Sequence, residues 1–512
     1  MGSLSKLPWK ISRLYCHSHL PLVAGYWKGS ISKEKYKKGR LSTCTHIRSI
    51  GTSVPVSRSQ VIPNSKSPET PLLKQLKARI KLSGPLTVYD YMKEVLINPV
   101  AGYYAAGQDM FGSQGDYITS PEICQMFGEL VGVWVYSEWY KLGSPKPLQL
   151  VELGPGRGTL MQDILRVLQQ FGEAGSDLSV HFVEVSEELS CKQEEKLCGV
   201  VQSNKEIDIV QAYQVMLDPS SKQYTAFPTH QGLMQYRTMP FGLVTACATY
   251  VRLMRKVLDD YEKELYFKKS TTTGGSPVFW YRHLGSVPRS FSVFLANEFF
   301  DVLPIHKICK TEDGWREVLI DIDEGDGPHH LRYVLSRAET PATKVFIQPE
   351  ETRDEIEVSP DAAVLCEELA SRIEEDGGIA LIMDYGHDGK DSSTFRAFKN
   401  HALHDPLCEP GTADLTADVD FAHLKGQIQE RVITYGPVTQ SSFLTNMGIE
   451  FRLANLMKHC HLDEQKSLIS GFKMLTDPLK MGTRFKFLAF FPAAVKDFLK
   501  KHPPAGFYRY ED

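Results

Sequence analysis

The chain has 512 residues, of which 42% are hydrophobic and 23% are charged. This composition is typical of a globular protein and excludes a disordered or collagen-like chain. No apolar run approaches the roughly 18 residues needed to cross a bilayer, which excludes an integral membrane protein. At about 100 to 200 residues per domain, the length predicts two to four structural units.

Charge is distributed unevenly along the chain. The first 60 residues hold eleven Lys or Arg and one acid, Glu34, whereas the remaining 452 hold 47 bases and 61 acids. The acidic body argues against a nucleic-acid binder, which would present a basic face. The basic, Ser-rich leader has the composition of an organelle transit peptide; a basic disordered arm is the alternative.

The ten cysteines are scattered and form no C-x-x-C pair. Neither a disulfide framework nor a zinc site is therefore indicated. A reducing compartment such as the mitochondrial matrix fits both the cysteines and the leader.

The folded body is expected to begin near Leu72, after a Pro- and Ser-rich linker that ends at residue 71. Apolar residues at helical spacing predict a helix over 86–96. Ser120, Pro121 and Glu122 predict another helix start, with a capping hydroxyl, a proline in the first turn and an acid near the positive end. The helix that follows, over 123–140, is apolar enough to be largely buried.

A strand, a glycine loop, a helix and a second strand follow in order over residues 148–185. This βαβ unit predicts an α/β fold with a doubly wound, mostly parallel sheet. Further strands are predicted over 291–297, 316–322 and 379–385, so we expect the sheet to continue to at least residue 385.

The first strand runs into three glycines, Gly154, Gly156 and Gly158. Such glycines permit positive φ and close approach of the backbone to a ligand, although a tight strand-to-helix turn would also explain them. A dinucleotide site would need its third glycine at position 159, which is Thr159. The G-x-G-x-G spacing behind an acidic strand is instead similar to the first motif of class I (Rossmann-like) S-adenosylmethionine-dependent methyltransferases.

Two acids flank this loop at the ends of the two strands. Glu152 could accept a hydrogen bond from the ammonium group of S-adenosylmethionine, and Glu184 could bridge its two ribose hydroxyls. Carboxylates buried beside a loop are costly unless they are paired, which favours a ligand-binding role.

The strand over 291–297 is followed by Glu298 and Asp301. Ligands of open α/β sheets bind beyond the carboxyl ends of the strands, so both acids are candidates for the catalytic site. Methyl transfer depends mainly on positioning, and paired carboxylates suit a cationic acceptor such as guanidinium. The alternative is structural: Glu298 caps the next turn, and Asp301 pairs with a surface base.

Asp414, Asp418 and Asp420 form a third acidic group. Their spacing is not that of a calcium loop, and no His joins them at a ligand interval. A helix start packed over the sheet is the favoured interpretation, and we expect no metal site.

Several segments together resemble the MidA family of mitochondrial methyltransferases: "GYYAAGQDMFGSQGDYITSPEICQMFGE", "LVELGPGRGTLMQDIL", "ANEFFDVLPIHK", "GWREVLIDID", "IMDYGHDG", "PGTADLTADVDF" and "FLTNMGIEFRL". The resemblance runs from about Thr87 to Phe487. It implies an S-adenosylmethionine site on Gly154, Gly156, Gly158 and Glu184. It also implies symmetric dimethylation of an arginine on a complex I subunit in the mitochondrial matrix. A non-catalytic complex I assembly chaperone on a methyltransferase scaffold is the alternative.

Residues 212–258 depart from that family and resemble a retrotransposon reverse transcriptase, in "TAFPTHQG" and "MPFGLVTACATYVRLM". A polymerase needs separated aspartates that hold two metals, and the segment lacks the aromatic-x-Asp-Asp hairpin, so no polymerase activity is expected. A transposon-derived exon and a gene-model error both explain it. The segment lies between Glu184 and Glu298, where contacts to adenine would be expected.

These features divide the chain into seven expected parts. They are a transit peptide (1–60), a linker (61–71), an N-terminal helical segment (72–147), the first part of the methyltransferase core (148–211), the inserted retroelement-like segment (212–270), the second part of the core (271–390) and a C-terminal extension of the catalytic domain (391–512).

Overall fold

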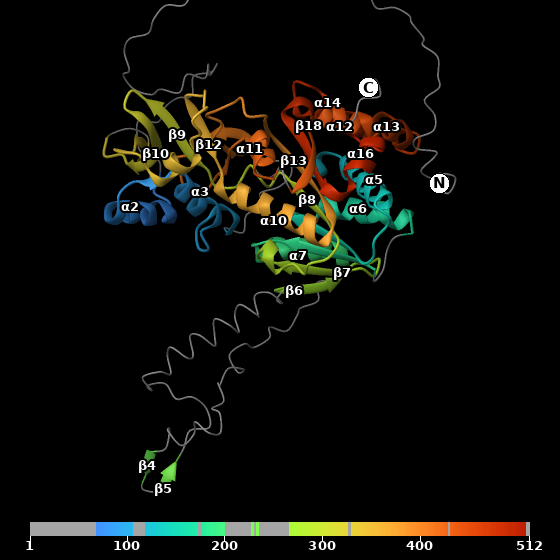
Figure 1. The fold of residues 1–512 in the computed structure, drawn as a ribbon, viewed down its shortest axis with the longest axis horizontal. Helices are drawn as coiled ribbons and strands as arrows, with labels where there is room; N and C mark the ends of the chain where they lie inside the picture. Colours follow the sequence, from blue (N-terminus) through green and yellow to red (C-terminus); the bar gives the residue numbers. More distant parts are fainter. Residues whose placement is uncertain are drawn as a thin grey trace, which may run out of the picture. The chain divides into compact units, whose positions relative to one another are not determined.

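The computed structural model describes residues 68–105, 118–172, 177–199, 266–325, 329–428 and 431–507, together with the backbone of 227–229 and 232–234. All of these belong to one compact unit of the chain, which spans Ser65–Asp512 (Figure 1). The expected transit peptide, most of the expected linker and most of the inserted segment lie outside the described residues.

A nine-stranded sheet forms the centre of this unit, in the order β18-β19-β13-β8-β2-β3-β7-β6, with β17 paired to β13. The middle of the sheet, from β13 through β8, β2 and β3 to β7, is parallel. The predicted parallel α/β fold is therefore confirmed. The strands are β2 (Leu148–Leu153), β3 (Leu178–Val183), β6 (Lys268–Thr271), β7 (Pro277–Tyr281), β8 (Ser292–Asn297), β13 (Gly378–His387), β17 (Val419–Asp420), β18 (Val432–Thr439) and β19 (Phe485–Pro492).

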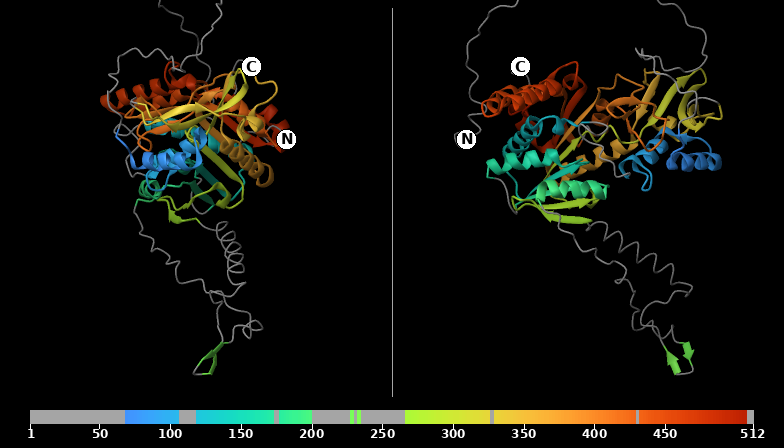
Figure 2. Two further views of the ribbon diagram at one scale, coloured as in Figure 1. Left: turned by 90° about the vertical axis from the view of Figure 1, so that its left-hand side faces the viewer. Right: turned by 180° about the vertical axis from the view of Figure 1, so that it is seen from behind.

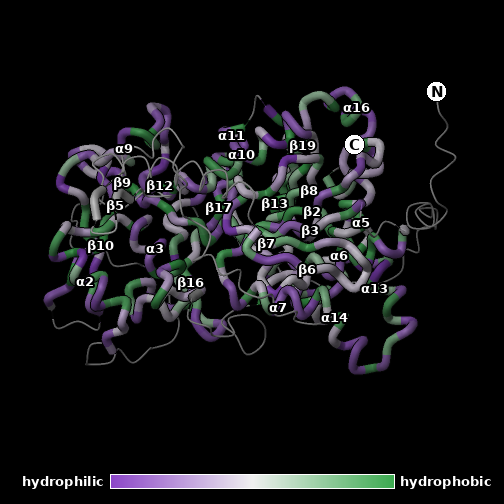
Figure 3. The backbone as a smooth tube through the Cα atoms, turned by 90° about the horizontal axis from the view of Figure 1, so that it is seen from below, coloured by the Kyte–Doolittle hydropathy of each residue, from purple (hydrophilic) through white to green (hydrophobic). Residues whose placement is uncertain are grey.

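Helices cover both faces of the central sheet, so its middle strands are buried on both sides and mainly hydrophobic (Figure 3). Successive side chains of β19 point to opposite faces. Phe487 packs on Phe127 of α5, whereas Leu488 shares a core with Leu369 of α10. The helices that flank the sheet are α5 (Gln125–Lys141), α6 (Thr159–Gln170), α7 (Glu187–Cys198), α10 (Pro360–Asp376) and α11 (Phe421–Ile428).

A second, antiparallel sheet lies at one end of the central sheet (Figure 2), in the order β1-β10-β9-β12, with β11 paired to β10. The prediction that the strand over 316–322 continues the central sheet is therefore wrong. Its burial alternates along much of its length, as expected of a strand that packs through one face. The strands are β1 (Leu86–Thr87), β9 (His306–Thr311), β10 (Gly314–Ile322), β11 (Leu331–Leu335) and β12 (Glu355–Val358).

Two N-terminal helices, α2 (Pro71–Ser83) and α3 (Val88–Ile97), pack on the second sheet. The predicted helix over 86–96 is confirmed as α3, which Thr87 caps by accepting a hydrogen bond from the Asp90 N–H group. Their core also contains Leu189 of α7, so it joins this layer to the central fold.

The predicted capping role of Ser120 is wrong. Ser120 is fully buried and is the first residue of α4 (Ser120–Ile123), and Thr119 occupies the cap position. The expected long helix is a separate helix, α5, which begins at Gln125.

The remaining elements complete the C-terminal part of the unit. Four helices connect β18 to β19, and a small three-stranded sheet follows β13. No helix among the described residues is long and apolar enough to cross a bilayer. These elements are α9 (Pro341–Phe346), α12 (Gln440–Asn446), α13 (Ile449–Met457), α14 (Leu462–Thr476), α15 (Met481–Arg484), α16 (Lys496–Lys501), β14 (Arg396–Lys399), β15 (Ala402–His404) and β16 (Asp414–Thr416); β4 (Phe227–Thr229) and β5 (Gly232–Met234) form a separate hairpin.

The inserted segment joins two elements that are already neighbours. It leaves the described fold after α7 and re-enters it before β6, the edge strand of the central sheet. The end of α7 is tied to the β6–β7 turn by a hydrogen bond from the Thr273 N–H to the Leu197 carbonyl, at 3.2 Å. β3 and β7, which lie on either side of the segment in the sequence, are paired in the sheet.

We predict that replacing residues 212–258 by a short Gly-Ser linker gives a folded and more soluble protein. Loop-closure entropy changes only slowly with loop length, whereas the segment adds apolar residues such as Phe241, Leu243 and Leu253 that favour aggregation if they are exposed. Thermal unfolding and light scattering of both proteins would test this, with S-adenosylmethionine affinity as a check of the fold. A lower melting temperature or lost binding would show that the segment is part of the fold.

Candidate functional site

The glycine loop after β2 has the backbone conformation that the sequence predicts. Gly154, Gly156 and Gly158 have φ values of 59°, 53° and 77°, in the left-handed region. A Cβ atom on Gly154 would lie 2.5 Å from the Phe299 ring, so the loop packs directly against the segment after β8. The two segments that carry the predicted site therefore meet.

Gln193 of α7 ties the glycine loop to the second acid. Its amide nitrogen donates to the Gly156 carbonyl at 2.7 Å and to Glu184 at 3.0 Å, while its amide oxygen accepts from the Trp280 indole at 2.8 Å. The other Glu184 oxygen accepts from the Ser186 N–H group at 2.8 Å. Both oxygens of Glu184 are thus held in place, although burial raises the pKa of this carboxyl group.

Glu152 is the acid without such support. It is 2% exposed, and its Oε2 atom has no hydrogen-bond partner among the described residues. Burial raises the pKa of Glu152 well above its usual value. An unsatisfied carboxyl group at the floor of a cavity is costly unless a ligand completes its hydrogen bonds.

A cavity of about 280 Å³ opens above the carboxyl ends of β2, β3 and β8. Glu152, Glu184 and Glu298 all line it, as do Gly154 and Gly156. It is also lined by residues of the N-terminal segment and of the stretch around the start of α4, which are Lys93, Leu96, Ile97, Tyr104, Thr119, Pro121 and Glu122.

Glu298 lies at the carboxyl end of β8 with φ of 50°, which is uncommon for a residue with a Cβ atom. Its Oε1 atom accepts from the Ser120 N–H at 2.7 Å and from the Asn297 amide at 3.4 Å. Both of these donors reach the same oxygen, Oε1, and the Ser120 hydroxyl adds a hydrogen bond to the carboxyl group. Burial, aided by the charge of Asp301, raises the pKa of Glu298 to about 7.

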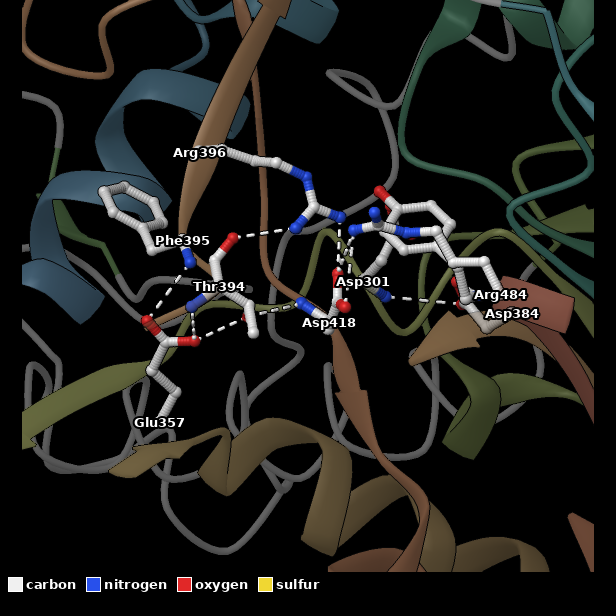
Figure 4. A network of polar contacts seen from close by, with 9 residues as sticks. Asp301, Glu357, Asp384, Thr394, Phe395, Arg396, Asp418 and Arg484 are labelled. Carbon is white, nitrogen blue, oxygen red and sulfur yellow. Dashed lines mark hydrogen bonds and ion pairs between the residues drawn. The ribbon is translucent and has the colours of Figure 1, made fainter. Parts of the chain in front are cut away.

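Asp301 lies behind this loop, outside the residues that line the cavity. It is 4% exposed and accepts a hydrogen bond from the Tyr385 hydroxyl. Arg396 and Arg484 lie over the Tyr385 ring, and both bind Asp418 (Figure 4). Burial raises the pKa of Asp301 to about 6. The structure thus brings Glu298, and not Asp301, to the cavity.

Asp384 on β13 is a further acid of this region, which the sequence did not reveal. Its Oδ2 atom accepts from three consecutive N–H groups, those of Phe299, Phe300 and Asp301, at 3.1, 2.9 and 3.3 Å. Its Oδ1 atom accepts from the Tyr385 N–H at 2.9 Å. Burial raises the pKa of Asp384, and these N–H donors oppose that rise. The motif "MDYGHDG" marked the end of a strand, but nothing in it indicated these partners.

The third acidic group is dispersed. Asp420 accepts from the His423 N–H at 3.0 Å at the start of α11, as the helix-start interpretation predicts. Asp418 pairs with arginines, and the Tyr104 hydroxyl donates to Asp414 at 3.1 Å. Within the described ranges, no cluster of three or more His, Cys, Asp or Glu could hold a metal ion.

The known proteins whose sequences are similar to this chain are methyltransferases. Residues 130–438 match a family model described as an S-adenosyl-L-methionine-dependent methyltransferase. The chain is 44% identical over 458 residues to "Protein arginine methyltransferase NDUFAF7 homolog, mitochondrial" of Drosophila melanogaster, covering 88% of this chain and 92% of that protein. It is 45% identical over 431 residues to "Protein arginine methyltransferase NDUFAF7, mitochondrial" of Homo sapiens, covering 84% and 85%.

The fold is also similar to a crystal structure from Burkholderia thailandensis that contains S-adenosyl-homocysteine. That comparison has a TM-score of 0.56 and 21% identity, and it covers 83% of this chain and 95% of the bacterial chain. At this identity the similarity supports the fold assignment alone.

We predict that Gly156→Val abolishes binding of S-adenosylhomocysteine without unfolding the protein. A branched side chain at φ of 53° would enter the space beside the cavity, and we expect the dissociation constant to rise at least about tenfold, or 1.4 kcal/mol. Calorimetry would measure it.

Gly172→Val is the matched control for this prediction. Gly172 also has positive φ, at 83°, but a Cβ atom there meets nothing within 4 Å. Both substitutions should lower stability by a similar 1–2 kcal/mol or so. Unchanged affinity of Gly156→Val, or an equal loss in Gly172→Val, would contradict the site assignment.

Proposed function

The chain belongs to the S-adenosylmethionine-dependent methyltransferase family, and from that premise we propose that it symmetrically dimethylates an arginine on a subunit of mitochondrial complex I. The observation that supports an enzyme most directly is the position of Glu298, whose carboxyl group is held by the Ser120 N–H in the same cavity as Glu152 and Glu184. The names of the relatives support arginine and a mitochondrial protein substrate.

The residues of the cavity fit S-adenosylmethionine. Glu152 has an unsatisfied oxygen that suits an ammonium group, and Glu184 retains lone pairs for two neighbouring hydroxyls. The glycine loop leaves room for a ligand close to its backbone. When bound, the cofactor would supply an activated methyl group on a sulfonium centre. The acceptor nitrogen would gain that methyl group and release one proton to solvent, so the protein has mainly to bind and orient the guanidinium group.

We assign Glu298 the contact with the guanidinium group of the substrate. A carboxylate in a buried setting binds guanidinium strongly, and it orients one nitrogen of the acceptor. The ionised form also stabilises the positive charge of the acceptor. Since Ser120 fixes the other oxygen, the side chain has little freedom to turn away.

Asp301 acts indirectly, through its effect on Glu298. Its charge contributes to the raised pKa of Glu298, and its own carboxyl group is held by the Tyr385 hydroxyl. It therefore acts on the acceptor through Glu298.

The mitochondrial matrix is the proposed compartment. The support is the basic leader over residues 1–60, in which eleven bases accompany a single acid.

We predict that this chain can replace its human relative in human cells that lack that relative. Expression of the wild-type chain should restore symmetric dimethylarginine on a complex I subunit, as measured by mass spectrometry, whereas Glu298→Gln should not. An equal amount of complex I with both proteins, and no dimethylarginine with either, would support the non-catalytic chaperone instead.

We also predict that the rate of methyl transfer depends on pH. The pKa of Glu298 is raised to about 7, so its carboxylate is present above that pH and is lost as the pH falls through it. The ratio kcat/KM for the protein acceptor, which reports the pKa values of the free enzyme, should therefore rise with a midpoint near pH 7. Glu298→Gln should lower the plateau by about 100-fold and remove this rise.

Glu312→Gln, an exposed acid in the β9–β10 turn, is the control for that experiment. It should keep the wild-type profile. A rise near pH 7 that persists in Glu298→Gln would assign the titration to another group and remove Glu298 from the proposed contact.

A further inference from the structure

The loop that carries Glu298 is held in an unusual shape. Glu298 has positive φ, a conformation that is unfavourable for any residue with a Cβ atom. Such a conformation persists only where the surrounding structure imposes it. The contacts that impose it here come from β13, the strand parallel to β8.

β13 contacts the loop through its backbone and through one side chain. The register pairs Met383 with Asn297, and the Glu298 N–H donates to the Met383 carbonyl at 2.9 Å. The next residue, Asp384, is 1% exposed and accepts from the N–H groups of residues 299, 300 and 301. Three consecutive N–H groups can converge on one oxygen only if the backbone curves around it.

We propose that Asp384 is a positioning residue for methyl transfer, which holds the loop after β8 so that Glu298 presents one carboxylate oxygen to the cavity. Without the carboxylate, three buried N–H groups lose their acceptor, and the loop has no reason to keep this curvature. This inference rests on the proposed role of Glu298.

The effect of Asp384 would extend to the lining of the cavity. Glu298 accepts from the Ser120 N–H at 2.7 Å, at the start of α4, and the neighbouring Thr119 and Pro121 line the cavity. Asp384 itself does not belong to the lining residues. It therefore acts on the acceptor through Glu298, and none of its hydrogen bonds involves Glu152 or Glu184, the proposed cofactor contacts.

The first test needs no substrate and uses hydrogen exchange on the full chain. In Asp384→Asn, and in Asp384→Ala, which leaves the three N–H groups without any side-chain acceptor, the amides of residues 299–301 should exchange at least about tenfold faster, while those of β2 should not change. The dissociation constant for S-adenosylhomocysteine should stay within about twofold of wild type. Unchanged exchange at 299–301 would overturn the proposal, because it would show that the loop does not depend on this carboxylate.

Asp376→Asn is the matched control. Asp376 lies at the end of α10, just before β13 begins, and pairs with Arg289 at 2.6 Å. It is thus at the opposite end of β13 from the cavity, and its substitution should change neither exchange at 299–301 nor turnover.

The second test is a double-mutant cycle on the turnover number, with tritiated S-adenosylmethionine and complex I assembly intermediates from cells that lack the relative. We expect about a tenfold loss for Asp384→Asn and about 100-fold for Glu298→Gln. The double variant should be no slower than Glu298→Gln alone, since Asp384 acts through Glu298. A multiplied loss of about 1,000-fold would show an independent, merely structural role.

Asp384→Glu serves as a second variant if Asp384→Asn does not fold. It keeps the charge but moves the carboxylate by one methylene group, and the same faster exchange at 299–301 is expected. If the wild-type chain transfers no methyl group, the proposed function fails, whereas the exchange experiment still decides whether Asp384 holds the loop.

Discussion

The cost of burying carboxyl groups at the ends of parallel strands determines the organisation of this protein. Glu184 and Glu298 directly follow β3 and β8, whereas Glu152 and Asp384 lie within the last residues of β2 and β13. Burial raises the pKa of each of these four carboxyl groups. The four carboxyl groups differ in how many of their oxygens accept hydrogen bonds. Asp384 and Glu184 have donors on both oxygens, Glu298 on one, and Glu152 has an oxygen with none. Of these four acids, the two with incomplete hydrogen bonding, Glu152 and Glu298, line the cavity, where a ligand can complete it. This is the physical basis of the proposed site.

A parallel sheet leaves the carboxyl edge of its strands open, so the cavity needs walls from other parts of the chain. Part of the cavity lining comes from α3 and the residues after it, which precede the central sheet in sequence. The second sheet anchors α3, because Ile320 of β10 and Leu96 of α3 share one core with Leu189 of α7. α3 and Tyr104 therefore contribute directly to the cavity, and α2 supports them through the shared core.

Sequence reasoning succeeded where function depends on contacts that are local in the chain. The βαβ unit, the positive φ of the three glycines and the strand-end positions of Glu152, Glu184 and Glu298 follow from neighbouring residues. It failed where a contact joins distant segments. Ser120 looked like a helix cap because its neighbours suit one, yet its N–H group is bound by Glu298, 178 residues away. Asp384, Gln193 and the second sheet were missed for the same reason, since hydropathy along a strand does not reveal which sheet the strand joins.

The position of the inserted segment is consistent with a working site. An insertion between α7 and β6 enters at the edge of the central sheet, beyond the last parallel strand. β7 keeps its parallel pairing with β3, from Val180 with Val278 to Val183 with Tyr281. The chain then reaches the cavity again at Arg282, immediately after β7. Since the pairing of β3 with β7 places Glu184 beside Arg282, the part of the site that follows the insertion is built by the sheet and does not depend on the length of the loop that precedes it.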